Sequence, residues 1–246
     1  MTRTYLFMGL VGIWLVSWVF VSWNAYAGSC TECHQDPDWR IKNRKLYDYY
    51  HQWEGSIHDE AGVVCSDCHG GDPEATQKEA AHGMHIDPAD RESPVHYQNL
   101  ATTCGGCHQA VYQNFVASTH YRKLKQDDAA PHCGTCHGAM NAQVEHQFIN
   151  PICDTCHDGQ ALPDVTPQAR RILHQLKVAK AYLGWTHLYY AEKGEPHKMD
   201  RLQRQFTQIA DAWHQFKLDT TEEESKELLI ELQGVLKKAR AEQGAN

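Results

Sequence analysis

Every cysteine of this 246-residue chain belongs to a C-x-x-C pair, and a histidine directly follows each pair. The ten cysteines form five such motifs: Cys30/Cys33/His34, Cys65/Cys68/His69, Cys104/Cys107/His108, Cys133/Cys136/His137 and Cys153/Cys156/His157. A bare C-x-x-C pair also occurs in thioredoxin-like redox sites, zinc sites and disulfide frameworks. The trailing histidine separates these alternatives, because C-x-x-C-H is the attachment motif of c-type haem. We therefore expect five covalently attached haems c, with zinc clusters as the remaining alternative.

The motifs also constrain the fold. Two thiols three positions apart on a short helical turn reach the two vinyl groups of one porphyrin, and the adjacent imidazole then points at the iron. Each haem is a large flat hydrophobe, so it supplies apolar mass to a chain that is only 41% hydrophobic. We expect a mainly α fold with much irregular loop, in which a multihaem cytochrome c core wraps around five haems.

The first 27 residues form a separate unit. One arginine precedes an apolar run from Tyr5 to Trp23, and Ala25-Tyr26-Ala27 is typical of a signal-peptide cleavage site. The run is longer than the roughly 7 to 15 residues of a secretory h-region and close to the about 20 residues of a membrane span. This length favours a retained transmembrane anchor over a cleaved signal peptide, and either segment exports the chain.

The cysteines stop after the fifth motif, and residues 161–246 show helical periodicity instead. Helices are predicted from Pro167 to about Lys193, from about Lys198 to Lys217, and onward from a cap at Thr220 or Thr221. Three helices joined by short breaks indicate an antiparallel hairpin or bundle packed on the haem core. The chain is thus expected to divide into a 1–27 anchor, a 28–160 pentahaem domain and a 161–246 helical region.

The formal net charge of the chain is -8, and haem propionates would make the assembled protein more acidic still. An acidic surface argues against nucleic acid as a partner, because nucleic acid binds through its phosphates to Lys and Arg. It suits basic electron-transfer partners, and simple solubility is the alternative explanation.

An internal repeat singles out two histidines outside the motifs. The stretches "WEGSIH" and "NFVASTH" each place an aromatic residue three positions before Ser-x-His, and each lies between two haem motifs. The matching residues are Trp53, Ser56 and His58 in the first, and Phe115, Ser118 and His120 in the second. A surface histidine has no reason to recur in this setting, so we interpret His58 and His120 as distal axial ligands. The alternative is that both pack on haem rings or bond propionates.

Three segments resemble the multihaem cytochromes c related to cytochrome c554 and hydroxylamine oxidoreductase. They are "SIHDEAGVVCSDCHGGDPEATQKEAAHGMH", "SPVHYQNLATTCGGCHQAVYQNFVASTH" and "PHCGTCHGAMNAQVEH", and the resemblance covers about residues 30 to 157. It implies distal ligation by His58, His82, His120 and His146. The competitors for the fifth distal position are His85, His96, His132 and His174. We select His174, as the one that reaches over from the helical region.

Two further resemblances concern the ends of the chain. An N-terminal span directly ahead of the haems is similar to the membrane-anchored quinol dehydrogenases of the NapC/NirT and NrfH type. Their ligating methionine is absent here, because Gln35-Asp36-Pro37 follow the first motif. The helical tail resembles those of hydroxylamine oxidoreductases and pentahaem nitrite reductases, which implies subunit association. Met84 and Met140 lie near motifs, where they are alternative axial ligands or pack on a ring edge.

These features predict a membrane-anchored pentahaem electron carrier on the periplasmic side of a bacterial inner membrane, or a soluble periplasmic one if the chain is cleaved after Ala27. Its donor would be the quinol pool or a quinol-oxidising complex, and its acceptor a periplasmic redox partner. One alternative is an oxidoreductase that acts on a small nitrogen or sulfur species at a haem with an open coordination site. Another is a subunit of a larger respiratory complex. Because no C-x-x-C-K motif is present and histidines are abundant, we favour electron transfer over catalysis.

Overall fold

The computed structural model describes residues 28–126, 130–138, 140–159 and 162–243. Within these ranges the chain is mainly helical and has no strand, which confirms the expected mainly α class. The part of the chain that the structure describes contains no helix that is both long and apolar enough to cross a bilayer. The anchor predicted for residues 1–27 lies outside the described residues.

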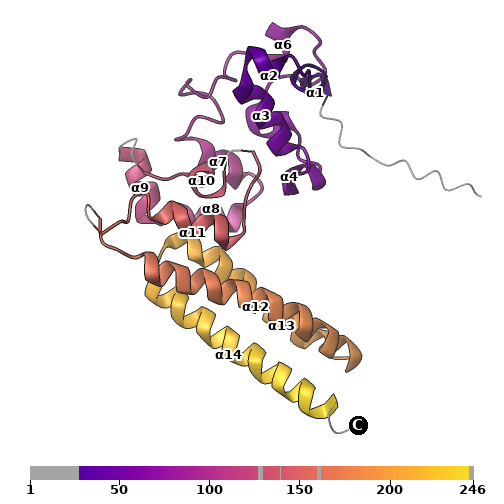
Figure 1. The fold of residues 1–246 in the computed structure, drawn as a ribbon, viewed down its shortest axis with the longest axis vertical. Helices are drawn as coiled ribbons and strands as arrows, with labels where there is room; N and C mark the ends of the chain where they lie inside the picture. The colour runs from indigo at the N-terminus through magenta and orange to yellow at the C-terminus, as the bar shows by residue number, and fades with distance from the viewer. Residues whose placement is uncertain (1–27, 127–129, 139, 160–161, 244–246) are drawn as a thin grey trace, which may run out of the picture.

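Short helices and loops make up the described chain as far as residue 159. The short helices are α1 (Gly28–His34), α2 (Trp39–Lys42), α3 (Arg44–Trp53), α4 (Ile57–Glu60), α5 (Cys65–His69), α6 (Lys78–His82), α7 (Leu100–Gly105), α8 (Gln109–Val116), α9 (Thr119–Gln126), α10 (Cys133–His137) and α11 (His146–Cys153). Three long helices follow: α12 (Thr166–Glu192), α13 (Pro196–Ala212) and α14 (Leu218–Gln243), with the 3-10 turn η1 (Trp213–Gln215) between the last two. In Figure 1 the earliest helices lie at one end of the molecule, α7 to α11 in the middle, and the long helices at the other end.

The haem motifs occupy short helical turns, as the spacing of their thiols requires. The first motif ends α1, and the second and fourth coincide with α5 and α10. The third bridges the end of α7 and the start of α8, and the fifth begins at the end of α11. Gly70 and Gly138 follow α5 and α10 with φ angles of 70° and 80°. Glycine takes this left-handed conformation without steric cost, so it stops each helix directly after the motif histidine.

The long helices pack on one another around a shared apolar core. Ile172 of α12, Leu202 of α13 and Leu228 of α14 are each fully buried in it. Proline in the first turn opens both α12 and α13, where its missing N–H costs no helical hydrogen bond. The ribbon leaves the middle of the molecule along α12, returns along α13 and leads out again along α14 (Figure 1).

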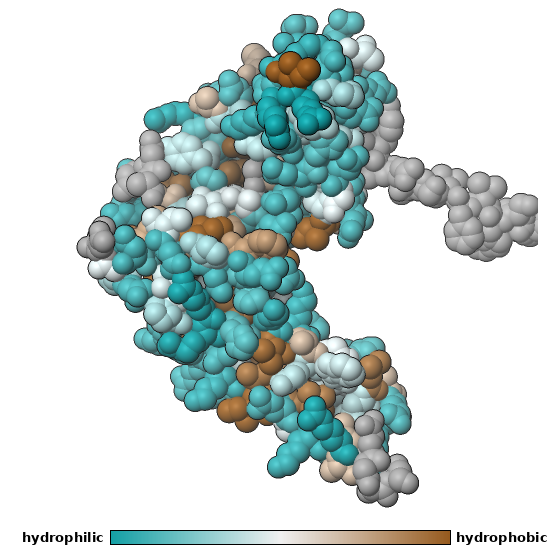
Figure 2. Space-filling view, in the orientation of Figure 1, coloured by the Kyte–Doolittle hydropathy of each residue, from teal (hydrophilic) through white to brown (hydrophobic). Residues whose placement is uncertain are grey.

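A second, smaller core lies in the middle of the molecule. It consists of Ala101, Phe115 and Leu124, from α7, α8 and α9. Phe216, which directly follows η1, packs against both cores and so joins the long helices to the haem-motif region. Figure 2 shows a mostly hydrophilic face with small, separate hydrophobic spots.

Candidate haem sites

Four of the five motif histidines face a histidine from outside the motifs. The ring centroids are 6.1 Å apart in the pairs His34–His82, His58–His108 and His120–His157, and 6.2 Å apart in His137–His214. Two imidazoles that bind opposite sides of one metal ion, each through a nitrogen about 2 Å away, have centroids roughly 6 Å apart. The four pairs therefore have the spacing of axial ligands across an iron atom.

The spacing alone does not separate these pairs from ordinary ring contacts, whose centroids lie about 4.5–7 Å apart. The choice of partners does. Each pair joins one motif histidine to one histidine that lies outside the motifs and in another segment of the chain. Ordinary packing has no reason to repeat this combination four times, so the residues present fit the axial positions of haem iron.

The repeated aromatic and Ser-x-His elements now have a structural explanation. Ser56 accepts a hydrogen bond from the N–H of Asp59 at 3.2 Å, and Ser118 accepts one from Tyr121 at 3.0 Å. Each buried serine thereby caps the helix that follows, α4 or α9, in the manner of an N-cap. His58 and His120 are the second residues of those helices, so the cap sets the direction in which each ring points.

Both aromatic residues of the repeat are buried as well. Trp53 donates a hydrogen bond from its indole N–H to the carbonyl of Val63 at 3.0 Å, and Phe115 packs in the small core. Trp53 and Phe115 thereby hold in place α3 and α8, the helices that precede the two capping serines. The repeat is therefore one building unit used twice: a buried ring, a capping serine and a projecting imidazole.

The environment of the paired rings favours neutral imidazole. Burial lowers the pKa of His34, His58, His120 and His214 below the ordinary value for histidine, and the charge of the facing histidine lowers it further. Neutral imidazole is the form that binds a metal ion, because the ligating nitrogen must carry a free electron pair. These four rings are thus kept in the form that ligation needs.

Hydrogen bonds from Nδ1 orient three of the rings. His137 bonds the carbonyl of Gln143 at 2.6 Å, and His157 bonds the carbonyl of Pro163 at 3.0 Å. His214 bonds the carbonyl of Ala210 at 3.2 Å. A backbone carbonyl accepts only an N–H, so Nδ1 carries the proton and Nε2 is left with the free electron pair, as in many metal-ligating histidines.

Cysteines of successive motifs lie next to one another in chain order. Burial and then a neighbouring thiol raise the pKa of Cys65, Cys68 and Cys136, and the respective neighbours are Cys30, Cys104 and Cys153. For Cys65 and Cys136 the pKa rises to about 11. A side-chain hydrogen bond with Cys133 is the main cause that raises the pKa of Cys104. A thiol of each motif thus interacts with a thiol of the next motif along the chain.

The second cysteines of the first, third and fifth motifs, Cys33, Cys107 and Cys156, are exposed, whereas the other seven cysteines are partly buried. The helices explain the difference. Cys33 lies at the end of α1, and Cys107 and Cys156 lie beyond the ends of α7 and α11, where few side chains cover them.

The even-numbered motifs show the contrast. Cys68 and Cys136 lie inside α5 and α10, and both are partly buried. All ten cysteines keep the C-x-x-C-H spacing that haem attachment requires, so exposure changes their surroundings and not the motif.

His69 of the second motif differs from the other four motif histidines. Burial lowers its pKa, and the charge of His34 in the first motif lowers it further, so the two motif histidines are neighbours. Among the ring contacts of the described residues, none joins His69 to another histidine. Within the described ranges, no imidazole therefore faces the second motif.

The remaining candidate ligands fall into two groups. His85 bonds Asp90 and Glu92 through its two nitrogens, and Nδ1 of His96 accepts the N–H of Gln98 at 3.3 Å, which puts the proton of that ring on Nε2. His174 is exposed on α12. By contrast, His132 and His146 each hold a buried Nδ1 without a hydrogen-bond partner. Among the ring contacts of the described residues, none joins His146 or His174 to a motif histidine.

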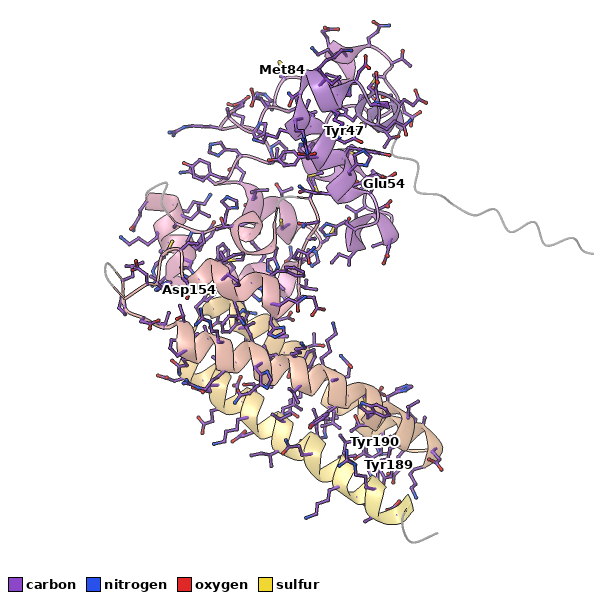
Figure 3. The ribbon with its side chains drawn as sticks, in the orientation of Figure 1. Tyr47, Glu54, Met84, Asp154, Tyr189 and Tyr190 are labelled. Atoms are coloured by element: carbon purple, nitrogen blue, oxygen red, sulfur yellow. The ribbon has the colours of Figure 1, made fainter. Side chains whose placement is uncertain are left out.

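Sequence reasoning did not select His214, because it chose His174 as the ligand from the helical region. The structure places His214 opposite His137, at the point where the chain turns from α13 into α14. The one signal in the sequence was the break in helical periodicity near Phe216. Met84 is 87% exposed at the end of the molecule formed by the first helices (Figure 3), while Met140 is partly buried.

The described residues contain no group of three or more His, Cys, Asp or Glu side chains placed to hold a metal ion.

Comparison with known proteins gives one informative match. No family model matches the chain, and no solved structure does. The chain is 29% identical over 144 residues to the multihaem cytochrome MtrA of Shewanella baltica (strain OS185), a match that covers 57% of this chain and 34% of MtrA. The chain thus spans about a third of that relative. The match supports a multihaem cytochrome c in general. Haem c is accordingly the cofactor that the C-x-x-C-H motifs bind.

Proposed function

We propose that this chain is an electron carrier whose five haems c follow one another in single file, in the order of the motifs. The observation that carries the proposal is that four motif histidines face histidines from outside the motifs, with ring centroids 6.1–6.2 Å apart. The thiols of successive motifs also interact in the order of the chain. When bound, each haem takes up or releases one electron at its iron. The chain fixes the order of the haems and wraps them in protein.

The facing histidines define what this arrangement does chemically. In the proposal, His82, His58 and His120 are the distal ligands of the haems at the first, third and fifth motifs, since they face His34, His108 and His157. Imidazole on both faces leaves no coordination position for a substrate, and it favours a low-spin iron that changes charge with little rearrangement. The second haem has no facing imidazole among the described residues, so the proposal assigns it no distal ligand.

The place of action and the partners are part of the same proposal. Residues 1–27 would anchor the chain on the periplasmic side of a membrane, close to a quinol-linked donor, and a periplasmic protein would accept the electrons. Trp185 and Leu188 of α12 are 65% and 63% exposed, which suits association with another subunit through the long helices. Intact mass of the purified protein tests the anchor, because cleavage after Ala27 removes a segment of known mass.

Haem count and spin state test the carrier function. The full-length protein is purified, its haems are counted by the pyridine haemochrome assay, and the oxidised sample is examined by low-temperature EPR. We expect five haems per chain, all low-spin. Fewer than five would contradict the count, and a high-spin haem at full stoichiometry would contradict a purely electron-transferring role.

One observation favours a second candidate function. His69 has no facing imidazole among the described residues, so the second haem is the one that would bind a small nitrogen or sulfur species at an open position. The EPR experiment separates the two functions. A single high-spin haem whose signal disappears on addition of cyanide would support catalysis at the second motif, whereas five low-spin haems would exclude it.

A further inference from the structure

We propose that His214 is the distal axial ligand of the haem bound at the fourth motif, so that the C-terminal helices form part of the haem-binding core. The inference rests on the proposed function, because it assumes a haem at Cys133, Cys136 and His137. Its basis is the facing of the His214 and His137 rings, with centroids 6.2 Å apart and an interplanar angle of 29°.

Both rings use Nδ1 for orientation and leave Nε2 for ligation. Nδ1 of His137 donates to the carbonyl of Gln143 at 2.6 Å. Nδ1 of His214 donates to the carbonyl of Ala210 at 3.2 Å, with Asp211 at 3.3 Å as a second acceptor. Ala210 and Asp211 lie in the last turn of α13, so the end of the helix itself holds the ring.

The neighbours of His214 fix the turn that carries it. Trp213 is buried in the core of the long helices, and the side-chain amide of Gln215 donates to Asn114 of α8. Phe216 takes a left-handed backbone conformation, with φ of 56°. A non-glycine residue in this region carries strain, which indicates that its surroundings enforce the turn. The turn is thus held from both sides, as a ligand position requires.

The same turn also supports the next haem site. The ring of Phe216 packs edge-on against His120, with centroids 4.3 Å apart, and His120 faces His157 of the fifth motif. Phe216 is therefore a positioning residue for His120. The connection between α13 and α14 serves two neighbouring haems, one by ligation and one by packing.

The rival ligands are less suited to the fourth motif. His146, which the family resemblance favours, begins α11 and faces no motif histidine in the described structure. His174, the other candidate from the helical region, is exposed on α12. His214 is the one non-motif histidine whose ring faces His137 in the described residues.

Single substitutions in the full-length holoprotein test the inference. The variants are His214→Ala, His146→Ala, His174→Ala and, as a matched control on α13, His197→Ala, whose side chain is exposed. The haem count and the EPR spin state are measured for each. We expect His214→Ala to keep every haem covalently bound and to convert one haem from low-spin to high-spin. Added imidazole should reverse the change, and the control should match the wild type.

Two results would overturn the inference. The first is that all haems of His214→Ala keep the spin state of the wild type. The second is that His146→Ala or His174→Ala gains a high-spin haem, which added imidazole converts back to low-spin, while the spin state of His214→Ala does not change. If the His214→Ala protein cannot be purified, His214→Met is used, because methionine still offers a ligand at this position. We expect one haem of His214→Met to gain methionine ligation and a higher reduction potential. Unchanged reduction potentials would contradict the assignment. Failure of the proposed function would already appear in the wild type, as a wrong haem count, so the two failures are distinguishable.

Discussion

His58 lies between the first two haem motifs but faces His108 of the third, with ring centroids 6.1 Å apart. In the proposed function this pair ligates the third haem, so His58→Ala should convert one low-spin haem to high-spin. The same substitution should have no such effect in a Cys104→Ser/Cys107→Ser protein, which lacks the third haem. EPR of the two oxidised proteins, with exposed His51→Ala as the control, gives the answer. A new high-spin signal in both backgrounds would assign His58 to another haem.

Ser118 is 1% exposed and caps α9 through its bond to the N–H of Tyr121. Ser118→Ala should lower the free energy of unfolding by about 1 kcal/mol, because the N–H is left buried without an acceptor. Urea denaturation followed by circular dichroism measures the change. Thr102→Ala, at an exposed position of α7, should stay within about 0.5 kcal/mol of the wild type. Equal stability of the two variants would show that the cap does not form.

Leu228 is 0% exposed in the core of the long helices, whereas Ile230 on the same helix is 59% exposed. Leu228→Ala should cost about 2–5 kcal/mol, since it removes buried methyl groups and leaves a cavity. Ile230→Ala should change the stability by less than about 0.5 kcal/mol. Thermal unfolding of both variants provides the comparison. A small effect at Leu228 would contradict the packing of α14 against α12 and α13.

His85 and Asp90 form an ion pair at 2.7 Å, which raises the pKa of His85 above its ordinary value. The N–H of Glu92 and then His85 lower the pKa of Asp90. The pair therefore stabilises the loop between the two ordinary pKa values. This contribution is lost as the pH rises through the raised pKa of His85, or falls through the lowered pKa of Asp90.

Asp90→Asn should accordingly bring the pKa of His85 down towards the ordinary histidine value, because the charged partner is lost. An NMR titration of the His85 ring measures this, with Asp87→Asn as a control in the same loop. An unchanged pKa in Asp90→Asn would show that the pair is absent in solution. A His85 ring that does not titrate at all would show that it binds iron instead.

The sequence predicted those features that depend on local spacing. The five motifs are recognisable because thioether chemistry requires two thiols three positions apart, and α12, α13 and α14 cover the stretches whose apolar residues recur with helical periodicity. The pairing of rings is different, since it depends on which segments meet in space. Nothing near His58 in the sequence points to His108 rather than to a nearer motif. His214 escaped notice because its neighbours carry a helical pattern, which describes their packing but not the turn that ends it.

The exposure of Cys33, Cys107 and Cys156 could not be predicted from the sequence for a related reason. All five motifs share one spacing, so nothing in that spacing distinguishes a thiol inside a helix from one at or past its end. The difference arises from where each helix stops, which the surrounding residues decide.

In the proposed function, the crossed pairing of histidines would give the protein an order of assembly. In a chain exported from its N-terminus, His58 and His120 would already be present when the third and fifth motifs emerge, so those haems would meet their proposed distal ligands at once. The haem at the first motif would have to wait for His82. With the pairing proposed for His214, the fourth is completed last, after almost the whole chain has crossed. A shortened chain would then retain an open iron, and full coordination would mark a complete protein.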